Sequence, residues 1–142
     1  MISIEQITPE LTWHLRRDVL YPSMKLFEME MEQDTYGMHF GAFNDIKLAA
    51  VVSLFQNGTD FQFRKLAVDP EYQHKGIGSS LLAYITDHAV KNGGTRIWCN
   101  ARDTAIGFYL KLGYRSTGGE IFSKNGINYE IVEKEITPSS NH

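Results

Sequence analysis

The residues with the clearest capacity for chemistry lie in the stretch Gln73-His74-Lys75-Gly76-Ile77-Gly78-Ser79. A helix that begins here would leave backbone N–H groups unpaired at the positive end of its dipole. Glycine has no Cβ, so a ligand can approach those amides closely. The stretch therefore predicts a site for a phosphate or a pyrophosphate group.

Two better-known phosphate loops do not fit this stretch. A Walker A loop needs Lys-Ser or Lys-Thr after its last glycine, whereas Gly78 is followed by Ser79-Ser80. A dinucleotide fingerprint needs a third glycine, and Leu81 stands at that position. The pattern that remains is Q-x-x-G-x-G, for which an ordinary glycine-rich helix start is the alternative interpretation.

The elements around this stretch must hold it at the end of a strand. Residues 61–68 are rich in aromatic and β-branched side chains, and Asp69-Pro70 ends the strand because proline cannot donate to a sheet. Apolar residues then recur at helical spacing, and they are Ile77, Leu81, Leu82, Ile85 and Ala89. The predicted unit is a strand, a loop and a helix.

Two longer segments carry a family resemblance. The run from Arg64 to Leu82, with Val68-Asp69-Pro70 and the glycine stretch, resembles motif A of the GCN5-related N-acetyltransferases, the GNAT superfamily. The run Ala105-Ile106-Gly107-Phe108-Tyr109-Leu110-Lys111-Leu112-Gly113-Tyr114 is similar to motif B of that superfamily. The order and spacing of both motifs match, and the resemblance extends over nearly the whole chain.

The resemblance implies that acetyl-CoA is the cosubstrate and that no metal is needed. The fourth strand would pair with the pantetheine arm through the backbone of Leu66, Ala67 and Val68, and an amide near Val68 would polarise the acetyl carbonyl. Tyr109 would be the general acid, because its phenol is protonated at neutral pH. The complete implied cofactor set is Leu66, Ala67, Val68, Gln73, His74, Lys75, Gly76, Ile77, Gly78, Ser79, Asn100 and Phe108.

The acceptor site and the general base have weaker signals. The acidic residues Glu28, Glu30, Glu32 and Asp34 alternate with Met29 and Met31. This predicts either a solvated acidic loop or, through the resemblance, one wall of a pocket for a cationic amine. His39 has a suitable intrinsic pKa for a base, although a histidine on a strand is more often structural. Arg16-Arg17 is interpreted as a solvated face, and Cys99 as a packing residue at the end of the fifth strand.

Composition predicts one domain over residues 1–136 and a polar tail over residues 137–142. A net charge of −3 disfavours nucleic acid. The single cysteine favours a reducing compartment, and the sequence shows neither an apolar run long enough for a bilayer nor a leader at Met1. We therefore expect a cytoplasmic protein with no membrane partner, and a homodimer is compatible with this.

The remaining pattern predicts a mixed α/β sheet of about seven strands flanked by helices. The resemblance to the GNAT superfamily implies that strands four and five splay apart. A first strand at residues 2–7 precedes a helix that Thr8-Pro9 opens, with Leu11, Leu15 and Val19 as its apolar stripe. Turn residues separate strands at 36–43, 46–55 and 61–68. A helix to residue 91, a parallel strand at 95–99, a helix from 103 to 113 and a closing hairpin of 114–122 with 126–135 follow.

Three functions remain compatible with the sequence. The first is an N-acetyltransferase acting on a small-molecule or peptide primary amine by direct attack in a ternary complex. The second is a non-catalytic acyl-CoA sensor on the same fold, because a fold does not fix a function. The third is an interaction module whose glycine loop is only structural.

Overall fold

The structure is a computed structural model that describes residues 1–139. The chain packs into two compact units. The first contains Met1–Phe55 and Phe63–Asp87, and the second contains Gln56–Gln62 and the chain from His88 onward. Hydrogen bonds join the strands in the order β1-β2-β3-β4-β5-β8-β6, and β7 pairs with β8.

The first unit is built on antiparallel strands whose ends follow the turn signals. Its strands are β1 (Ile2–Ile7), β2 (Met38–Asn44), β3 (Lys47–Asn57) and most of β4 (Asp60–Val68). Asp45 and Gly58, at the two predicted turns, have φ of 55° and 64°, in the left-handed region that tight hairpins require. The predicted meander is therefore confirmed, with ends shifted by one or two residues.

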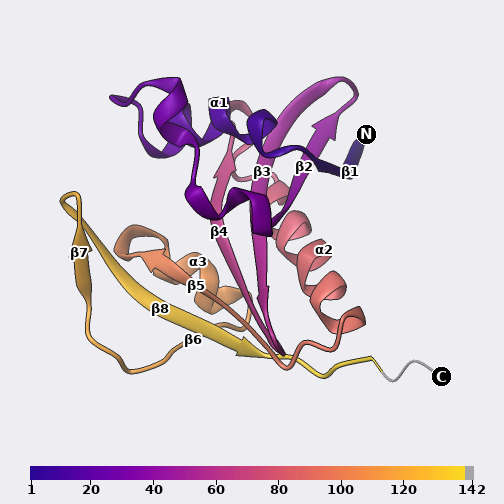
Figure 1. Ribbon diagram of the computed structural model, residues 1–142, viewed down its shortest axis with the longest axis vertical. Coiled ribbons are helices and arrows are strands. Elements are labelled where there is room, and N and C mark those ends of the chain that lie inside the picture. Colours follow the sequence, from indigo (N-terminus) through magenta and orange to yellow (C-terminus); the bar gives the residue numbers. More distant parts are fainter. Residues whose placement is uncertain (140–142) are drawn as a thin grey trace. The chain divides into compact units, whose positions relative to one another are not determined.

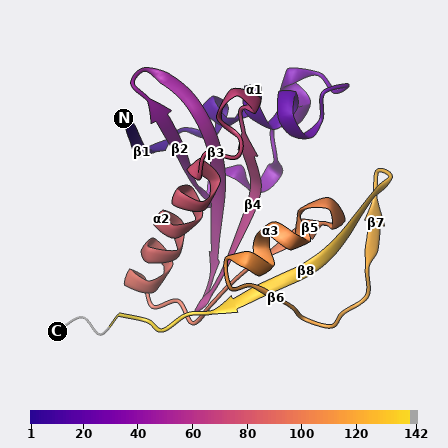
Figure 2. The ribbon, with the colours of Figure 1, turned by 180° about the vertical axis from the view of Figure 1, so that it is seen from behind.

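Helical segments cover both faces of this sheet (Figures 1 and 2). Helix α2 (Ile77–Lys91) lies on one face, where Tyr84 contacts the ring of Phe40 at 5.6 Å. On the other face, Leu15 packs with Val51 of β3 and Ala67 of β4 in a buried apolar cluster. The core of the first unit therefore lies on both sides of β2, β3 and β4.

The face of the sheet opposite α2 is covered by a series of short helical turns rather than by the regular helix that the sequence predicted. The series contains η1 (Pro9–Thr12), α1 (Trp13–Leu15), the π-helical η2 (Arg16–Leu20), η3 (Leu26–Met29) and η4 (Glu32–Tyr36). The sequence predicted a helix opened by Thr8 and Pro9. The Thr8 side chain makes no capping hydrogen bond, so of these two residues only Pro9 acts as the predicted start signal. The predicted apolar stripe is also rotated, because Leu11 is 52% exposed whereas Thr12, Leu15 and Arg16 are buried.

The second unit has β5 (Arg96–Arg102) between the start of β4 and the long strand β8 (Ile127–Glu135). The pair β4–β5 is parallel over Asp60–Gln62, as predicted for strands that a helix connects. The predicted splay of the two strands beyond these residues stays a prediction. Helix α3 (Ile106–Lys111), preceded by η6 (Asp103–Ala105), lies beside β5 and β8 (Figure 1).

Two sequence expectations for the second unit are wrong. Residues 114–122 do not form one strand: they contain the two-residue β6 (Arg115–Ser116), then irregular chain, then the start of β7 (Phe122–Lys124). The described residues therefore form eight strands, against the expected number of about seven. Cys99 lies in the middle of β5, not at its end, because the strand continues to Arg102. The mixed α/β class itself is confirmed.

The predicted tail is described as far as Ser139, and residues 140–142 lie outside the described residues. Its beginning is attached to the second unit. The amide of Ile136 donates to the Thr95 carbonyl at 3.0 Å, and the amide of Ser139 donates to the Val90 carbonyl at 3.0 Å. The bond from Ser139 holds the described part of the tail against the end of α2.

Candidate active site

Residues 73–76 form an exposed loop that leads from η5 (Pro70–Tyr72) into α2. The helix begins with Ile77, which is buried, and with Gly78 and Ser79, which are half-buried. Gly76 has a φ of 81°, and a Cβ built on it would meet nothing within 4 Å. The amide and the hydroxyl of Ser80 both donate to the Gly76 carbonyl at 3.0 Å, which fixes the first turn of α2. Open main chain at a helix N-terminus is the arrangement that an anion site requires.

Basic and aromatic side chains lie next to this loop. The Lys75 ammonium lies 5.8 Å from the ring centroid of Tyr72, and Lys47 lies 5.5 Å from the same ring. Lys47 also pairs with Glu71 at 2.9 Å, and this hydrogen bond raises its pKa. Lys47 is therefore positively charged at neutral pH, and Lys75 is the lysine nearest to Gly76 in sequence.

The end of β4 is tied to the glycine loop. Gln73 Nε2 donates to the Val68 carbonyl at 2.9 Å. Ala67 is buried, whereas Leu66 and Val68 are half-buried. Lys65, just before them, has a φ of 57° within the strand, a conformation that costs free energy for a residue with a Cβ. Gln73 thus holds the strand end in place, whether or not its amide also contacts a pyrophosphate.

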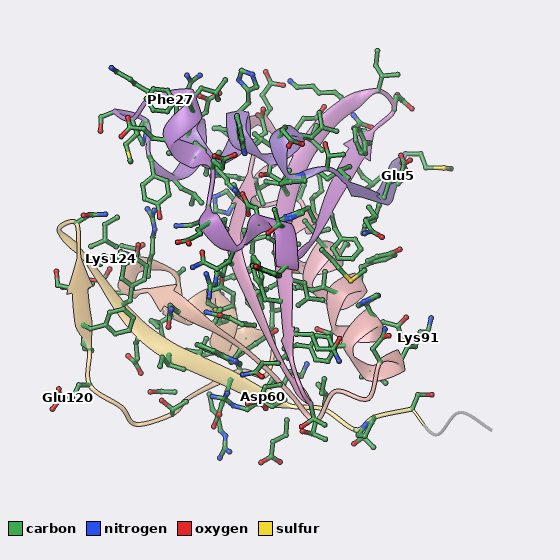
Figure 3. The ribbon with its side chains drawn as sticks, in the orientation of Figure 1. Glu5, Phe27, Asp60, Lys91, Glu120 and Lys124 are labelled. Atoms are coloured by element: carbon green, nitrogen blue, oxygen red, sulfur yellow. The ribbon has the colours of Figure 1, made fainter. Side chains whose placement is uncertain are left out.

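The acidic segment is ordered as the two turns η3 and η4. Glu28 Oε1 accepts a hydrogen bond from the Lys25 amide at 2.9 Å, and Met29 is buried. Glu30 and Glu32 are exposed. The side chain of Phe27 is 67% exposed and points away from the strands (Figure 3). The segment therefore presents carboxylates and an aromatic ring, while Met29 belongs to the core rather than to a pocket wall.

A buried polar cluster lies beneath this segment. It consists of Arg16, Asp34, His39 and Ser53, each at most 5% exposed. The predicted solvated face at Arg16 is therefore wrong, although Arg17 next to it remains partly exposed. The one signal for this burial was that Arg16 shares helical spacing with Thr12 and Val19. The solvated interpretation of the acidic segment is also wrong at Asp34, which is buried because it pairs with Arg16. Sequence reasoning missed Ser53, which belongs to no motif.

His39 is held by the cluster through both ring nitrogens. Nδ1 lies 2.7 Å from Ser53 Oγ, and Nε2 lies 2.9 Å from the Asp34 carbonyl oxygen. Because a carbonyl only accepts, Nε2 donates to the Asp34 carbonyl, and the Ser53 hydroxyl is the partner of Nδ1. This arrangement favours the structural interpretation of His39 over a contact with the acceptor.

The charge state of Asp34 should make stability depend on pH. Burial alone would raise the pKa of Asp34, but hydrogen bonds from Arg16 and from the Met31 amide, together with the charge of Arg16, lower it overall. A carboxyl with a depressed folded-state pKa contributes stability that is present above its unfolded pKa, about 4, and is lost as pH falls through its folded pKa. We expect Asp34→Asn to lower Tm at neutral pH and to flatten the acid side of the Tm profile. The control is Asp18→Asn, a substitution at an exposed site. If Tm falls as steeply with decreasing pH in Asp34→Asn as in this control, the role of Asp34 is contradicted.

Tyr109, the predicted general acid, lies on α3 in the second unit and is buried. Its ring packs edge-on against Tyr114 at 5.7 Å and against Phe108 at 5.2 Å. Burial, followed by the interactions with Cys99, raises the pKa of Tyr109 well above its usual range. The phenol is therefore protonated at any physiological pH and can act as a proton donor.

Cys99 is the hydrogen-bond partner of Tyr109. Burial raises the pKa of the Cys99 thiol to about 12, and the hydrogen bond from Tyr109 partly offsets this. The Tyr109 hydroxyl is thus the donor and the sulfur the acceptor, which is a weak role for a neutral thiol. A thiol with so high a pKa is not a nucleophile at neutral pH, in agreement with the packing role predicted for Cys99.

The other predicted site residues of the second unit are exposed. Asn100 lies on β5 opposite Ile131, and Phe108 on α3 is 37% exposed. Among residues 1–139, no group of three or more histidine, cysteine or acidic side chains could hold a metal ion. The same part of the chain contains no helix long and apolar enough to cross a membrane.

Comparisons with known proteins place these features in a family. The family model of the acetyltransferase (GNAT) domain matches residues 6–136. The uncharacterized N-acetyltransferase YitI of Bacillus subtilis is 28% identical over 141 residues, covering 93% of this chain and 94% of its own. The chain belongs to the GNAT acetyltransferase family, and it is an N-acetyltransferase by that membership.

Solved structures show the same fold. The ribosomal-protein-S18-alanine N-acetyltransferase of Escherichia coli superposes with a TM-score of 0.78 at 21% identity, covering 99% of this chain and 97% of that protein. A Bacillus subtilis acetyltransferase in complex with CoA superposes with a TM-score of 0.74 at 21% identity, covering 96% and 99%. The predicted fold is therefore confirmed.

Proposed function

We propose that this enzyme transfers the acetyl group of acetyl-CoA to a primary amine by direct attack within a ternary complex. The observation that carries the proposal is the open glycine loop at the N-terminus of α2, within a chain that matches the family over residues 6–136. The CoA bound to the related Bacillus subtilis acetyltransferase supports the choice of cosubstrate. In this proposal, the loop amides hold the pyrophosphate and the backbone of Leu66, Ala67 and Val68 pairs with the pantetheine arm.

The chemistry needs one bond formed and one broken. The unprotonated amine nitrogen attacks the acetyl carbonyl carbon, the C–N bond forms, and the C–S bond breaks. Tyr109 gives its proton to the departing thiolate and regains one from water, while the amine loses a proton. The Cys99 sulfur is a weak hydrogen-bond acceptor. The Tyr109 hydroxyl can therefore leave Cys99 and donate to the coenzyme A thiolate, with which it forms a stronger, charge-assisted hydrogen bond.

The acceptor is a small-molecule or peptide primary amine. The E. coli relative acts, by its name, on an alanine of a ribosomal protein, which supports a peptide amine. The exposed carboxylates of the acidic segment favour an acceptor that carries positive charge. The single cysteine, buried and reduced, supports a cytoplasmic location. A homodimer is compatible with the sequence, and the oligomeric state stays a prediction.

Two measurements test the proposed function. Titration calorimetry should show heat on addition of acetyl-CoA, and release of the free thiol should follow when amines, polyamines, amino acids and peptides are screened with it. Tight acetyl-CoA binding without turnover in the whole screen would favour an acyl-CoA sensor instead. No heat at all would leave the glycine loop with a structural role only.

The acidic segment should govern acceptor affinity. Combined substitution of Glu28, Glu30 and Glu32 by glutamine removes three negative charges, so the acceptor KM should rise roughly threefold to tenfold and depend less on salt. The measurement is acceptor KM at two ionic strengths. A matched control neutralises three exposed acids elsewhere in the unit: Glu5→Gln, Glu10→Gln and Asp45→Asn. Equal behaviour of both triple variants would mean that this segment is merely solvated.

A further inference from the structure

The cluster of Arg16, Asp34, His39 and Ser53 joins four separate elements of the first unit: η2, η4, β2 and β3. The Arg16 guanidinium donates from Nη1 to Asp34 Oδ2 and from Nη2 to Asp34 Oδ1, both at 3.0 Å. Nη2 also donates to Ser53 Oγ at 2.9 Å. Because Ser53 Oγ also lies 2.7 Å from His39 Nδ1, one chain of hydrogen bonds connects all four side chains.

The pair Ser53 and His39 resembles a nucleophile with its base, but its surroundings exclude that role. Ser53 is fully buried, and its oxygen already accepts from Arg16 and lies 2.7 Å from His39 Nδ1. A nucleophile must be reached by a substrate, and a fully buried hydroxyl does not meet this condition.

The cluster instead holds the main chain of the acidic segment. Arg16 Nη1 donates to the Met29 carbonyl at 3.0 Å, and the Met31 amide donates to Asp34 Oδ2 at 3.0 Å. His39 also donates to the Asp34 carbonyl. The cluster therefore holds three main-chain groups of the acidic segment: the Met29 carbonyl, the Met31 amide and the Asp34 carbonyl. Glu30 and Glu32, which lie between these fixed points, are exposed.

A buried ion pair is a poor source of stability, since desolvation offsets most of its attraction. Its bonds are nevertheless directional, and a bidentate arginine–carboxylate pair admits one geometry. Apolar packing could hold η3 and η4 against the sheet, but it would not fix individual carbonyl and amide groups. The cluster therefore suits the selection of one conformation better than it suits the stabilisation of the fold.

We propose that this buried cluster is a positioning device that holds the acidic segment in the conformation that receives the acceptor amine, with Arg16 as the central positioning residue. The acceptor half of this inference rests on the proposed function. The conformational half does not, because it concerns the order of residues 25–37 without any substrate.

The test uses a paired substitution, Arg16→Met with Asp34→Leu. Either change alone would leave one buried charge without its partner and could prevent folding. Together they remove both charges and keep apolar volume in the core, so the double variant should fold with a Tm near that of the wild type. The matched control is Arg17→Met with Asp18→Leu, which removes the neighbouring ion pair of 2.9 Å at an exposed position.

The first readout is hydrogen exchange of the free enzymes at the amides of Glu28, Glu30 and Gly37. These amides donate to the carbonyls of Lys25, Phe27 and Asp34, which the substitutions leave in place. We expect faster exchange in the Arg16/Asp34 variant by roughly tenfold or more, and no change in the control. Unchanged exchange would overturn the proposal, because the segment would then hold its conformation without the cluster.

The second readout is steady-state kinetics. In the Arg16/Asp34 variant the acceptor KM should rise by roughly tenfold, while the KM of acetyl-CoA stays the same, because displacing a substrate-positioning element affects the substrate that it positions. Faster exchange with wild-type acceptor kinetics would overturn the acceptor half. Absence of turnover by the wild type with every amine would instead overturn the proposed function, and the exchange result would still decide the conformational half.

Discussion

Replacing Tyr109 by phenylalanine should lower kcat and kcat/KM together by roughly 10²-fold while acetyl-CoA still binds. General acid catalysis contributes about 10²–10⁴-fold, and we expect the lower end because a coenzyme A thiolate can depart unassisted. The interaction of the hydroxyl with the sulfur strengthens as the C–S bond breaks, so both kinetic parameters should fall. The measurement is steady-state thiol release, with calorimetry to confirm cosubstrate binding.

The control for this substitution is Tyr114→Phe. Tyr114 is also buried and packs against the Tyr109 ring at 5.7 Å, so the control makes the same change in the same aromatic cluster. It should retain nearly all of the wild-type kcat. Wild-type rates in the Tyr109 variant, with chemistry shown to limit turnover, would remove Tyr109 from the mechanism.

Valine at Gly76 or Gly78 should abolish the rise in Tm that acetyl-CoA produces in the wild type. A ligand that binds only the folded state stabilises it by mass action, so the shift reports on the site. At Gly76 the φ of 81° disfavours any residue with a Cβ, and the side chain would occupy the open space over the loop. The measurement is thermal unfolding with and without saturating acetyl-CoA.

Gly93→Val is the matched control for backbone strain. Gly93, after the end of α2, has a φ of 83° and also has nothing within 4 Å of a built Cβ. It should lose a similar amount of stability and keep the full acetyl-CoA shift. If the variants at Gly76 and Gly78 also keep that shift, the pyrophosphate does not bind at this loop.

The sequence by itself determined the elements whose signals are local. Proline and glycine restrict φ and ψ wherever they stand, so the loop before α2 and the hairpin turns follow from neighbouring residues. The turns at Asp45 and Gly58, with φ of 55° and 64°, lie where turn residues were predicted to separate the strands. Because motif residues keep their order and spacing, the family could also be identified from sequence, and the match over residues 6–136 confirms it.

Only the tertiary structure decided the partners of side chains that meet across the chain. Arg16 is bound by Asp34 and by Ser53, which are 18 and 37 residues away, and no local pattern states which carboxylate a buried arginine will find. The Tyr109–Cys99 pair likewise depends on how α3 lies on β5. The segment 114–122 was predicted as one strand, but only β6 and β7, which lie at its two ends, pair with β8, over two and three residues. In each case long-range packing selects among conformations that local preferences leave nearly equal in free energy.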